Sequence, residues 1–248
     1  MFDPYEEIFE KRGHLYHKGM TLYPRARMEE FNSIIKLAKI RHGDIVCDIP
    51  SGGGYLKNFI NIRVKVVSIE TSRAFAKLCK ANTASDVILT NLDSIPIKTN
   101  SIDSIISLAG LHHIGDKESF YRESYRILKT NGVLAIADAC KGSMVSMFLD
   151  VFVHEHNSMG HRGAYLDENT KGDLEQCGFD VSYSSSIKYY WRFASLDDMV
   201  TYCQLLFGID NASHEQILGG ITKYLGYTLI NKEFCLNWEL TFYRAIKR

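Results

Sequence analysis

Apolar residues near the start of the chain recur at the spacing of an α-helix. This spacing is clearest from Phe31 to Ala38, and residues 1–42 as a whole are predicted to be helical. The pattern breaks at His42-Gly43-Asp44. We therefore expect a helical segment ahead of the main fold.

Between residues 43 and 140, short apolar runs alternate with amphipathic segments. The runs predict strands at residues 45–49, 65–70, 86–90, 102–108 and 133–139. Helices are expected between them, at residues 55–60, 73–82 and 117–128. Strands that alternate with helices pair in parallel through right-handed crossovers, which predicts a doubly wound sheet. Unbroken apolar runs in the fourth and fifth strands fit strands covered on both faces.

The last hundred residues have a different pattern. Helices are predicted at residues 143–156, 171–177, 195–207 and 214–225, and strands at 179–184, 187–191 and 237–246. Two long helices between late strands favour a cap rather than a second domain. We predict a single α/β domain over residues 1–248, with a Rossmann-like, mostly parallel, seven-stranded sheet. Its parts are an N-terminal helical lid (1–42), a core (43–140), and a cap with the closing strands (141–248).

Composition narrows the class of protein. Of the 248 residues, 46% are hydrophobic, which suits one α/β domain with a substantial core. Lys+Arg and Asp+Glu both number 29, so the chain lacks the basic excess that is typical of nucleic-acid binders. The six cysteines are scattered without a C-x-x-C pair, and no apolar run approaches the ~20 residues of a membrane helix. We expect a soluble cytoplasmic protein with neither a nucleic-acid nor a membrane partner; a homodimer is compatible with the sequence.

A glycine-rich turn follows the first predicted strand. The strand ends at Asp48, and Pro50-Ser51-Gly52-Gly53-Gly54 leads into the next helix. Glycine permits positive φ and a close approach of backbone to a ligand. In open α/β sheets, ligands bind beyond the carboxyl ends of the strands. The turn lacks G-x-G-x-x-G, because Lys57 stands where the third glycine would be needed, and this disfavours NAD or FAD.

Two acidic residues indicate what kind of ligand the turn binds. Glu70 ends the second strand, where a carboxylate can accept hydrogen bonds from both hydroxyls of a ribose. Asp93 follows the third strand and could accept a hydrogen bond from an adenine amino group. Together they indicate a ligand that contains adenosine.

These motifs, in this order and spacing, resemble the class I S-adenosylmethionine-dependent methyltransferases, in particular the small-molecule, methyltransferase type 11-like branch. The resemblance covers roughly residues 44–140. It rests on the segments Asp48 to Gly54, Val67 to Glu70, Asn91 to Ile97, Ser101 to Ser107, Leu111 to Ile114 and Glu123 to Gly132. The departure is Pro50, where the family more often has its first glycine.

The resemblance implies S-adenosylmethionine as cofactor and a role for each matching residue. Asp48 and Gly52 would hold the methionine amino group, with Pro50 and Gly54 in the same turn. Glu70 would bind the ribose. The remaining contacts would be Leu92 and Asp93 at the adenine and Leu108 at the methionine moiety.

Histidines are the candidate general bases, because their pKa lies near neutral pH. His112 and His113 follow the fourth strand, and relatives often use such a pair structurally. A second group, His154, His156 and His161, follows the first helix of the cap. His154, His156 and His113 are our candidates for catalysis. We predict no metal site, because His154 and His156 are two residues apart and would point to different sides of a helix.

The lid and the cap supply candidate substrate contacts. Tyr16, Tyr23 and Arg27 of the lid, and His161 of the cap, could contact substrate or cofactor; an ordinary amphipathic helix packed on the sheet is the alternative for the lid. Aromatic residues concentrate after residue 183, which would suit an apolar or aromatic acceptor such as a secondary metabolite.

The sequence thus predicts methyl transfer from S-adenosylmethionine to the oxygen, nitrogen or carbon of a small molecule. RNA or protein as acceptor is disfavoured, because the motif of amino-methylating nucleic-acid enzymes is absent from residues 107–112. Two alternatives remain open. The chain could be a cyclase that uses the bound cofactor without transferring methyl, or a non-catalytic methyltransferase-like subunit.

Overall fold

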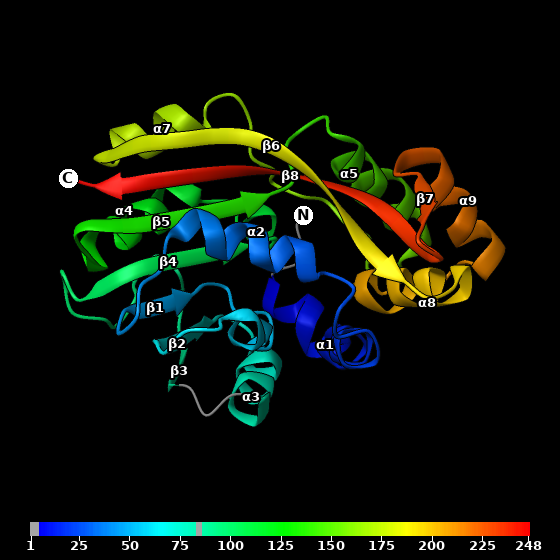
Figure 1. The fold of residues 1–248 in the computed structure, drawn as a ribbon, viewed down its shortest axis with the longest axis horizontal. Helices are drawn as coiled ribbons and strands as arrows, with labels where there is room; N and C mark the ends of the chain where they lie inside the picture. The colour runs from blue at the N-terminus through cyan, green and yellow to red at the C-terminus, as the bar shows by residue number, and fades with distance from the viewer. Residues whose placement is uncertain (1–4, 83–85) are drawn as a thin grey trace.

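A mixed β-sheet forms the centre of the computed structural model, which describes residues 5–82 and 86–248 (Figure 1). Within these residues the sheet has eight strands, in the order β3-β2-β1-β4-β5-β8-β6, with β7 paired to β8. The strands are β1 (Ile45–Asp48), β2 (Lys65–Glu70), β3 (Asp86–Leu89), β4 (Ile102–Leu108), β5 (Leu128–Asp138), β6 (Phe179–Phe193), β7 (Tyr227–Ile230) and β8 (Glu233–Lys247). Pairing is parallel from β3 to β5, and β8 is antiparallel to both β5 and β6. This confirms the predicted Rossmann-like α/β fold, but the sheet of the described residues has eight strands rather than the predicted seven.

Helices cover both faces of the sheet and one of its ends (Figure 1). The helices are α1 (Tyr5–Leu22), α2 (Met28–Ala38), α3 (Arg73–Asn82), α4 (Lys117–Ile127), α5 (Met144–Met147), α6 (His154–His156), α7 (Thr170–Gln176), α8 (Leu196–Phe207) and α9 (His214–Tyr224). A π-helical segment, Phe148–Val153, joins α5 to α6. The carboxyl ends of β4 and β5 point towards α1 and α8, which lie beyond the sheet (Figure 1). None of the helices in the described ranges is long and apolar enough to cross a membrane.

The late strands differ from the prediction. Two strands were expected at 179–184 and 187–191, but β6 is continuous from Phe179 to Phe193. Its middle is a run of exposed serines, and Ser186 Oγ lies 2.9 Å from Thr241 Oγ1 of β8. The strand persists because its backbone pairs with β8, which the hydrophobic pattern cannot reveal.

Two other local predictions were wrong. The short strand β7 was missed; it joins β8 through a tight turn in which Asn231 and Lys232 both have positive φ, the conformation that a type I′ hairpin requires. The helix expected from Tyr55 to Ile60 is only a 3-10 turn, η1 (Tyr55–Phe59).

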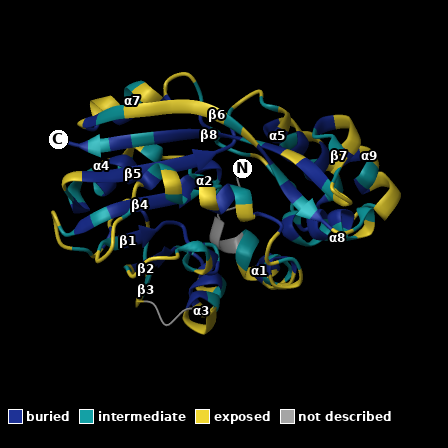
Figure 2. Ribbon diagram, in the orientation of Figure 1, coloured by how far each residue is buried: buried dark blue, intermediate teal, exposed yellow. Residues whose placement is uncertain are grey.

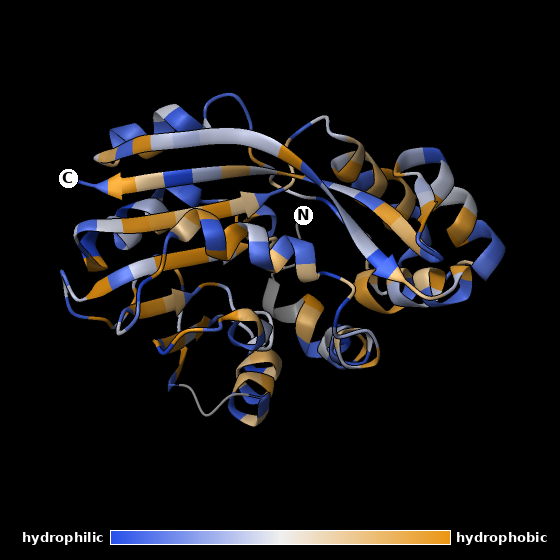
Figure 3. Ribbon diagram, in the orientation of Figure 1, coloured by the Kyte–Doolittle hydropathy of each residue, from blue (hydrophilic) through white to orange (hydrophobic). Residues whose placement is uncertain are grey.

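One apolar cluster joins the N-terminal helices to the late segments. It contains Phe31 and Ile34 of α2, Trp191 of β6 and Met199 of α8, all buried. The middles of β1, β2, β4 and β5 are mostly buried, whereas the middle of β6 and the outer faces of α7 and α9 are exposed (Figure 2). Hydrophobic residues follow β4 and β5 along their length (Figure 3). The lid and the cap therefore share their packing with one face of the sheet.

A buried ion pair lies within this cluster. Glu30 has no exposed surface; one of its carboxylate oxygens is bound by the guanidinium of Arg27. The other accepts a hydrogen bond of 2.6 Å from Nε1 of Trp191, which lies 161 residues away in the sequence. Arg27 also donates to the hydroxyl of Tyr16 in α1, at 2.9 Å. This network links α1 and α2 to β6.

We expect Glu30→Gln to lower the free energy of unfolding by about 3 kcal/mol, because it leaves the buried charge of Arg27 without its counter-ion. Urea denaturation monitored by circular dichroism would measure the loss. The neighbouring Glu29 provides the matched control. It pairs with Arg192 at 2.7 Å, and the two side chains are 33% and 29% exposed, so Glu29→Gln should cost less than about 1 kcal/mol. Equal costs for the two variants would contradict the importance of the buried pair.

Candidate active site

The glycine turn connects β1 to η1 at the carboxyl edge of the sheet. Gly52 has a φ of 55° and Gly53 a φ of 98°, so both lie in the left-handed region that glycine favours. The Ser51 backbone N–H donates to the carbonyl of Ile69 at 3.1 Å, which fixes the turn to β2. The turn therefore uses the positive φ that its glycines permit.

Two carboxylates are buried beneath this turn. Glu70 accepts hydrogen bonds from the backbone N–H groups of Gly52, Thr71 and Ser72, and its burial raises its pKa to about 7. Asp48 is 3% exposed. Burial, together with the charge of Glu70, raises the pKa of Asp48 well above its usual value.

The environment of Asp48 tests whether the cofactor implied by the sequence fits here. Its Oδ2 atom is buried and has no hydrogen-bond partner among the described residues. A buried carboxylate oxygen without a donor is costly, and an ammonium group from a ligand would satisfy it. The residues present thus fit the amino group of a methionine moiety at this position.

A cavity, which we call the turn cavity, lies beside the glycine turn. It is lined by Asp48, Pro50 and Gly52 of the turn, by Leu108 to Gly110 after β4, and by Phe9 and Tyr16 of α1. Phe9 packs on Phe75, with ring centroids 4.5 Å apart. Helix α1 therefore covers the turn from above.

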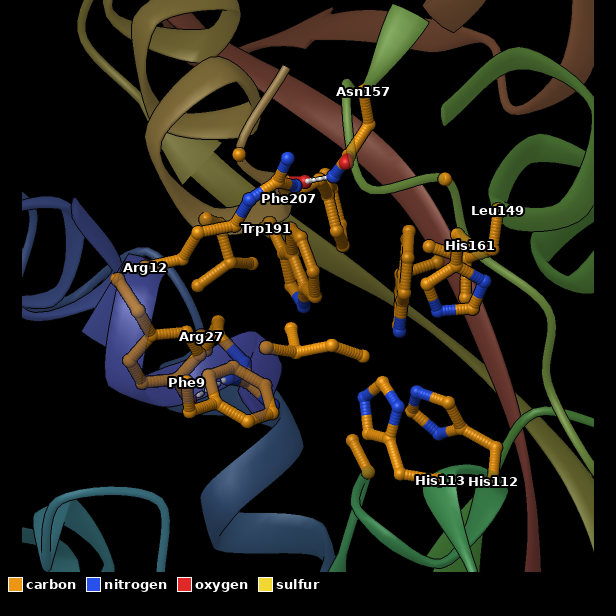
Figure 4. Close-up of a pocket in the computed structure, with 17 residues that line it drawn as sticks. Phe9, Arg12, Arg27, His112, His113, Leu149, Asn157, His161, Trp191 and Phe207 are labelled. Atoms are coloured by element: carbon orange, nitrogen blue, oxygen red, sulfur yellow. Dashed lines mark hydrogen bonds between the residues drawn. The ribbon is translucent and has the colours of Figure 1, made fainter. Parts of the chain in front are cut away.

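A second space, the inner cavity, lies between α1, α8 and the segment 157–161 (Figure 4). The part of it that a water-sized sphere can occupy measures about 100 Å³. Phe9, Arg12 and Arg27 lie on one side, and His112, His113 and His161 on the other (Figure 4). The aromatic walls are Trp191, Phe207 and Trp238.

The two cavities adjoin. Five residues line both of them: Phe9, Tyr16, Arg27, Ala109 and His113. A ligand in the inner cavity would therefore lie directly beside a ligand that contacts the glycine turn.

Three imidazoles form one wall of the inner cavity, and we call His112, His113 and His161 the histidine group. The ring centroids of His112 and His113 are 4.2 Å apart, and that of His161 lies within 5.6 Å of both. Burial and the two neighbouring histidines hold the pKa of His113 well below its usual value. Burial likewise lowers the pKa of His161. These two side chains are neutral at physiological pH.

Carboxylates orient two members of the histidine group. His112 Nδ1 lies 2.7 Å from Asp138 Oδ1, and His161 Nδ1 lies 3.0 Å from Asp150 Oδ1. Asp138 ends β5 at the carboxyl edge, so its position in the sequence could have revealed it. Asp150 lies in the π-helical segment, and no sequence signal pointed to it or to Arg12.

The structure separates the candidate residues into two sets. Those that line one or both cavities are Asp48, Pro50, Gly52, Leu108, Tyr16, Arg27, His113 and His161. Among the described residues that line neither cavity are Gly54, Glu70, Leu92, Asp93 and Tyr23. Glu70 and Leu92 are buried near the turn, Asp93 is exposed, and Tyr23 packs on Tyr202 at a centroid distance of 5.7 Å.

His154 and His156 also lie outside the linings of these two cavities. His154 Nδ1 accepts a hydrogen bond of 3.0 Å from the backbone N–H of His161. His156 Nδ1 lies 3.1 Å from the carbonyl oxygen of Asn211, and its ring packs on Phe152. The candidate bases His154 and His156 thus lie outside the inner cavity, whereas His161, expected as a substrate contact, lines it.

Comparisons with known proteins agree with this geometry. Residues 47–136 match the family model described as a methyltransferase domain. An uncharacterized protein of Methanocaldococcus jannaschii is 32% identical over 129 residues, which are 52% of this chain and 49% of that protein. An uncharacterized methyltransferase of Oceanobacillus iheyensis is 28% identical over 140 residues, covering 53% of this chain and 65% of that protein. The chain thus spans only about a half to two thirds of the length of these relatives.

A solved structure extends the likeness of the fold over nearly the whole chain. The S-adenosylmethionine-dependent methyltransferase of Thermotoga maritima superposes with a TM-score of 0.66 at 15% identity, covering 98% of this chain and 99% of that one. At this identity the likeness shows the fold alone, while the family match covers the glycine turn, Glu70 and Asp93. Residues 47–136 thus match a methyltransferase domain, and the fold as a whole is similar to that of S-adenosylmethionine-dependent methyltransferases, which supports S-adenosylmethionine as the cofactor.

Proposed function

We propose that this protein transfers the methyl group of S-adenosylmethionine to a small-molecule acceptor held in the inner cavity. The observation that carries the proposal is the junction of the two cavities at Ala109, His113 and Tyr16. An acceptor in the inner cavity would meet the methyl group of a cofactor at the glycine turn. The sulfonium makes the methyl group electrophilic by itself, so the protein's main task is to align and hold the reactants.

The residues around the turn have distinct tasks in this proposal. Asp48 would accept hydrogen bonds from the cofactor's amino group, and Glu70 would accept from the ribose. Leu92 and Asp93 would bracket the adenine, and Leu108 would lie beside the methionine moiety. Tyr16 and Phe9 of α1 would exclude water from above.

The walls of the inner cavity suggest the kind of acceptor. Trp191, Phe207 and Trp238 supply apolar surface for an aromatic or aliphatic body. Arg12 is 8% exposed; its Nη2 atom lies 3.5 Å from Asp210, whereas its Nη1 atom has no hydrogen-bond partner within the described part of the chain. A buried guanidinium nitrogen of this kind favours an acceptor with a carboxylate or another anionic group. Such a molecule fits the class of secondary metabolites.

An acceptor hydroxyl or ammonium group must lose a proton before it can attack the methyl group. The histidine group could accept this proton, because His113 lines both the inner cavity and the turn cavity. His113 and His161 are therefore our candidates for this step. The geometry favours them over His154 and His156, whose ring nitrogens contact the backbone of other segments.

Titration calorimetry should detect binding of S-adenosylhomocysteine to the wild-type protein. Glu70→Gln should weaken this binding by about 1–3 kcal/mol, because a buried hydrogen bond to the ribose is lost or weakened. Asp86→Asn, on the exposed side of the neighbouring strand, serves as the control and should bind normally. Failure of the wild-type protein to bind would contradict the proposed function.

The affinity for S-adenosylhomocysteine should rise about tenfold between pH 6 and pH 8. The ribose donates to the ionised form of Glu70, and a carboxyl with a pKa of about 7 is mostly protonated at pH 6 and mostly ionised at pH 8. Calorimetry across this range would measure the slope. Glu70→Gln cannot ionise, so an unchanged slope in this variant would rule out Glu70 as its source.

Incubation with cofactor that carries a deuterated methyl group, followed by mass spectrometry of a metabolite extract, should identify a labelled small molecule. With that acceptor, Arg12→Gln should raise KM by about 10–100-fold through loss of a charged hydrogen bond, and should leave the affinity for S-adenosylhomocysteine unchanged. Arg122→Gln, at an exposed ion pair on α4, is the matched control. Tight binding of S-adenosylhomocysteine with no labelled product would favour a protein that uses the cofactor without transferring methyl.

A further inference from the structure

We propose that the histidine group is a binding site for a divalent transition-metal ion, of which Zn²⁺ is the best match, and that the open coordination position of this ion faces the inner cavity. The hypothesis that the ion activates the acceptor rests on the proposed function; the metal site itself does not.

Three imidazoles from two separate segments converge in the histidine group. His112 and His113 belong to the 3-10 turn η2 (Leu111–His113) after β4, and His161 belongs to the segment after α6. One ring nitrogen of each can be chosen such that all three lie within 4.8 Å of one another. Three nitrogens on one zinc ion lie about 3.3 Å apart, given zinc–nitrogen distances of about 2.0–2.1 Å. Small rotations of the rings would close this difference.

Two of the three rings are also oriented by hydrogen bonds. In metal sites, a coordinating histidine donates its other ring N–H to a carboxylate or a carbonyl, which fixes the tautomer and the direction of the ligand nitrogen. His112 Nδ1 has this contact with Asp138, and His161 Nδ1 has it with Asp150. In both residues the Nε2 atom is thereby left as the acceptor that can bind a metal ion.

The two carboxylates are themselves held in place. Asp138 accepts from the backbone N–H groups of His112 at 3.0 Å and Ala139 at 2.7 Å. Asp150 accepts from the hydroxyl of Tyr165 at 2.6 Å and from the backbone N–H of Gly163 at 3.0 Å. A general base requires only one histidine that is oriented by one carboxylate. Here two histidines are each oriented by a separate carboxylate, and both rings lie beside a third histidine. This arrangement fits a metal site better than a single general base.

Three histidine ligands leave the fourth position of a tetrahedral zinc ion free for water or substrate. All three residues line the inner cavity, and His113 also lines the turn cavity. The free position would therefore face the acceptor, next to the place where the methyl group is expected.

A balanced reaction follows from this placement. With the ion bound, His113 and His161 would be ligands rather than bases. An acceptor hydroxyl or thiol on the ion would lose its proton to solvent, because the cation lowers its pKa. A lone pair of the metal-bound oxygen or sulfur then forms the bond to the methyl carbon. The bond from methyl to the sulfonium breaks, and its electron pair stays on sulfur, which gives neutral S-adenosylhomocysteine. No oxidant or reductant is involved.

The test is titration of the full-length, tag-free, metal-stripped protein with Co²⁺, whose visible absorption is strong in tetrahedral sites. We expect saturation at one equivalent and displacement by Zn²⁺. His161→Ala should weaken Co²⁺ binding by more than about 100-fold, through loss of a ligand. Asp150→Asn keeps all three ligands and should weaken binding by about 10–100-fold. His214→Ala, at an exposed histidine that pairs with Asp197, is the control and should bind as the wild type does.

Thermal denaturation by circular dichroism would show whether each variant is folded. If His161→Ala is destabilised, the Co²⁺ affinity of the wild type can be compared with that of Asp150→Asn and of His161→Gln instead. Absence of stoichiometric Co²⁺ binding in the wild type would overturn the proposal, as would unchanged binding in folded His161→Ala or His161→Gln. If the protein binds S-adenosylhomocysteine but not Co²⁺, the metal site is refuted and the proposed methyl transfer is retained. If the protein binds Co²⁺ but does not bind S-adenosylhomocysteine, the metal site is retained and the proposed methyl transfer is refuted.

Discussion

The arrangement of the site depends on one buried carboxylate, that of Glu30. It has no exposed surface and binds Arg27 on one side and the indole of Trp191 on the other. A buried charge is stable only when it is paired, so the segments that carry these three side chains must come together with little freedom. Arg27 in turn holds the hydroxyl of Tyr16, which lies above the glycine turn.

This network explains why the lid and the cap define one site although they lie far apart in the sequence. Tyr16 and Arg27 line both cavities, and Trp191 lines the inner one. The hydrogen bonds of Glu30 thus place α2 on the sheet and also set the distance between the glycine turn and Trp191 in the wall of the inner cavity. Removal of Glu30 should therefore affect the shape of the site as well as the stability of the fold.

The parallel part of the sheet and the later segments contribute different chemistry. The carboxyl ends of β1 and β4 supply Asp48, the glycine turn and the pair His112-His113. The segments after β5 supply His161, Asp150 and the aromatic walls. The cofactor would be bound at the carboxyl edge of the parallel strands, whereas the acceptor would be selected by segments whose positions depend on long-range packing.

The sequence by itself determined the alternating core, the glycine turn and the placement of Asp48 and Glu70, because these depend on local periodicity and on where a strand ends. It did not reveal the full length of β6, since an exposed serine run is held in a strand only by its pairing with β8. Nor did it reveal the histidine group: His161 lies far along the chain from His112 and His113, and spacing within the His154–His161 segment pointed away from a metal site. Only the tertiary structure decided which histidines meet, because the packing of the cap against the sheet edge, rather than any local pattern, brings their rings to one wall of the inner cavity.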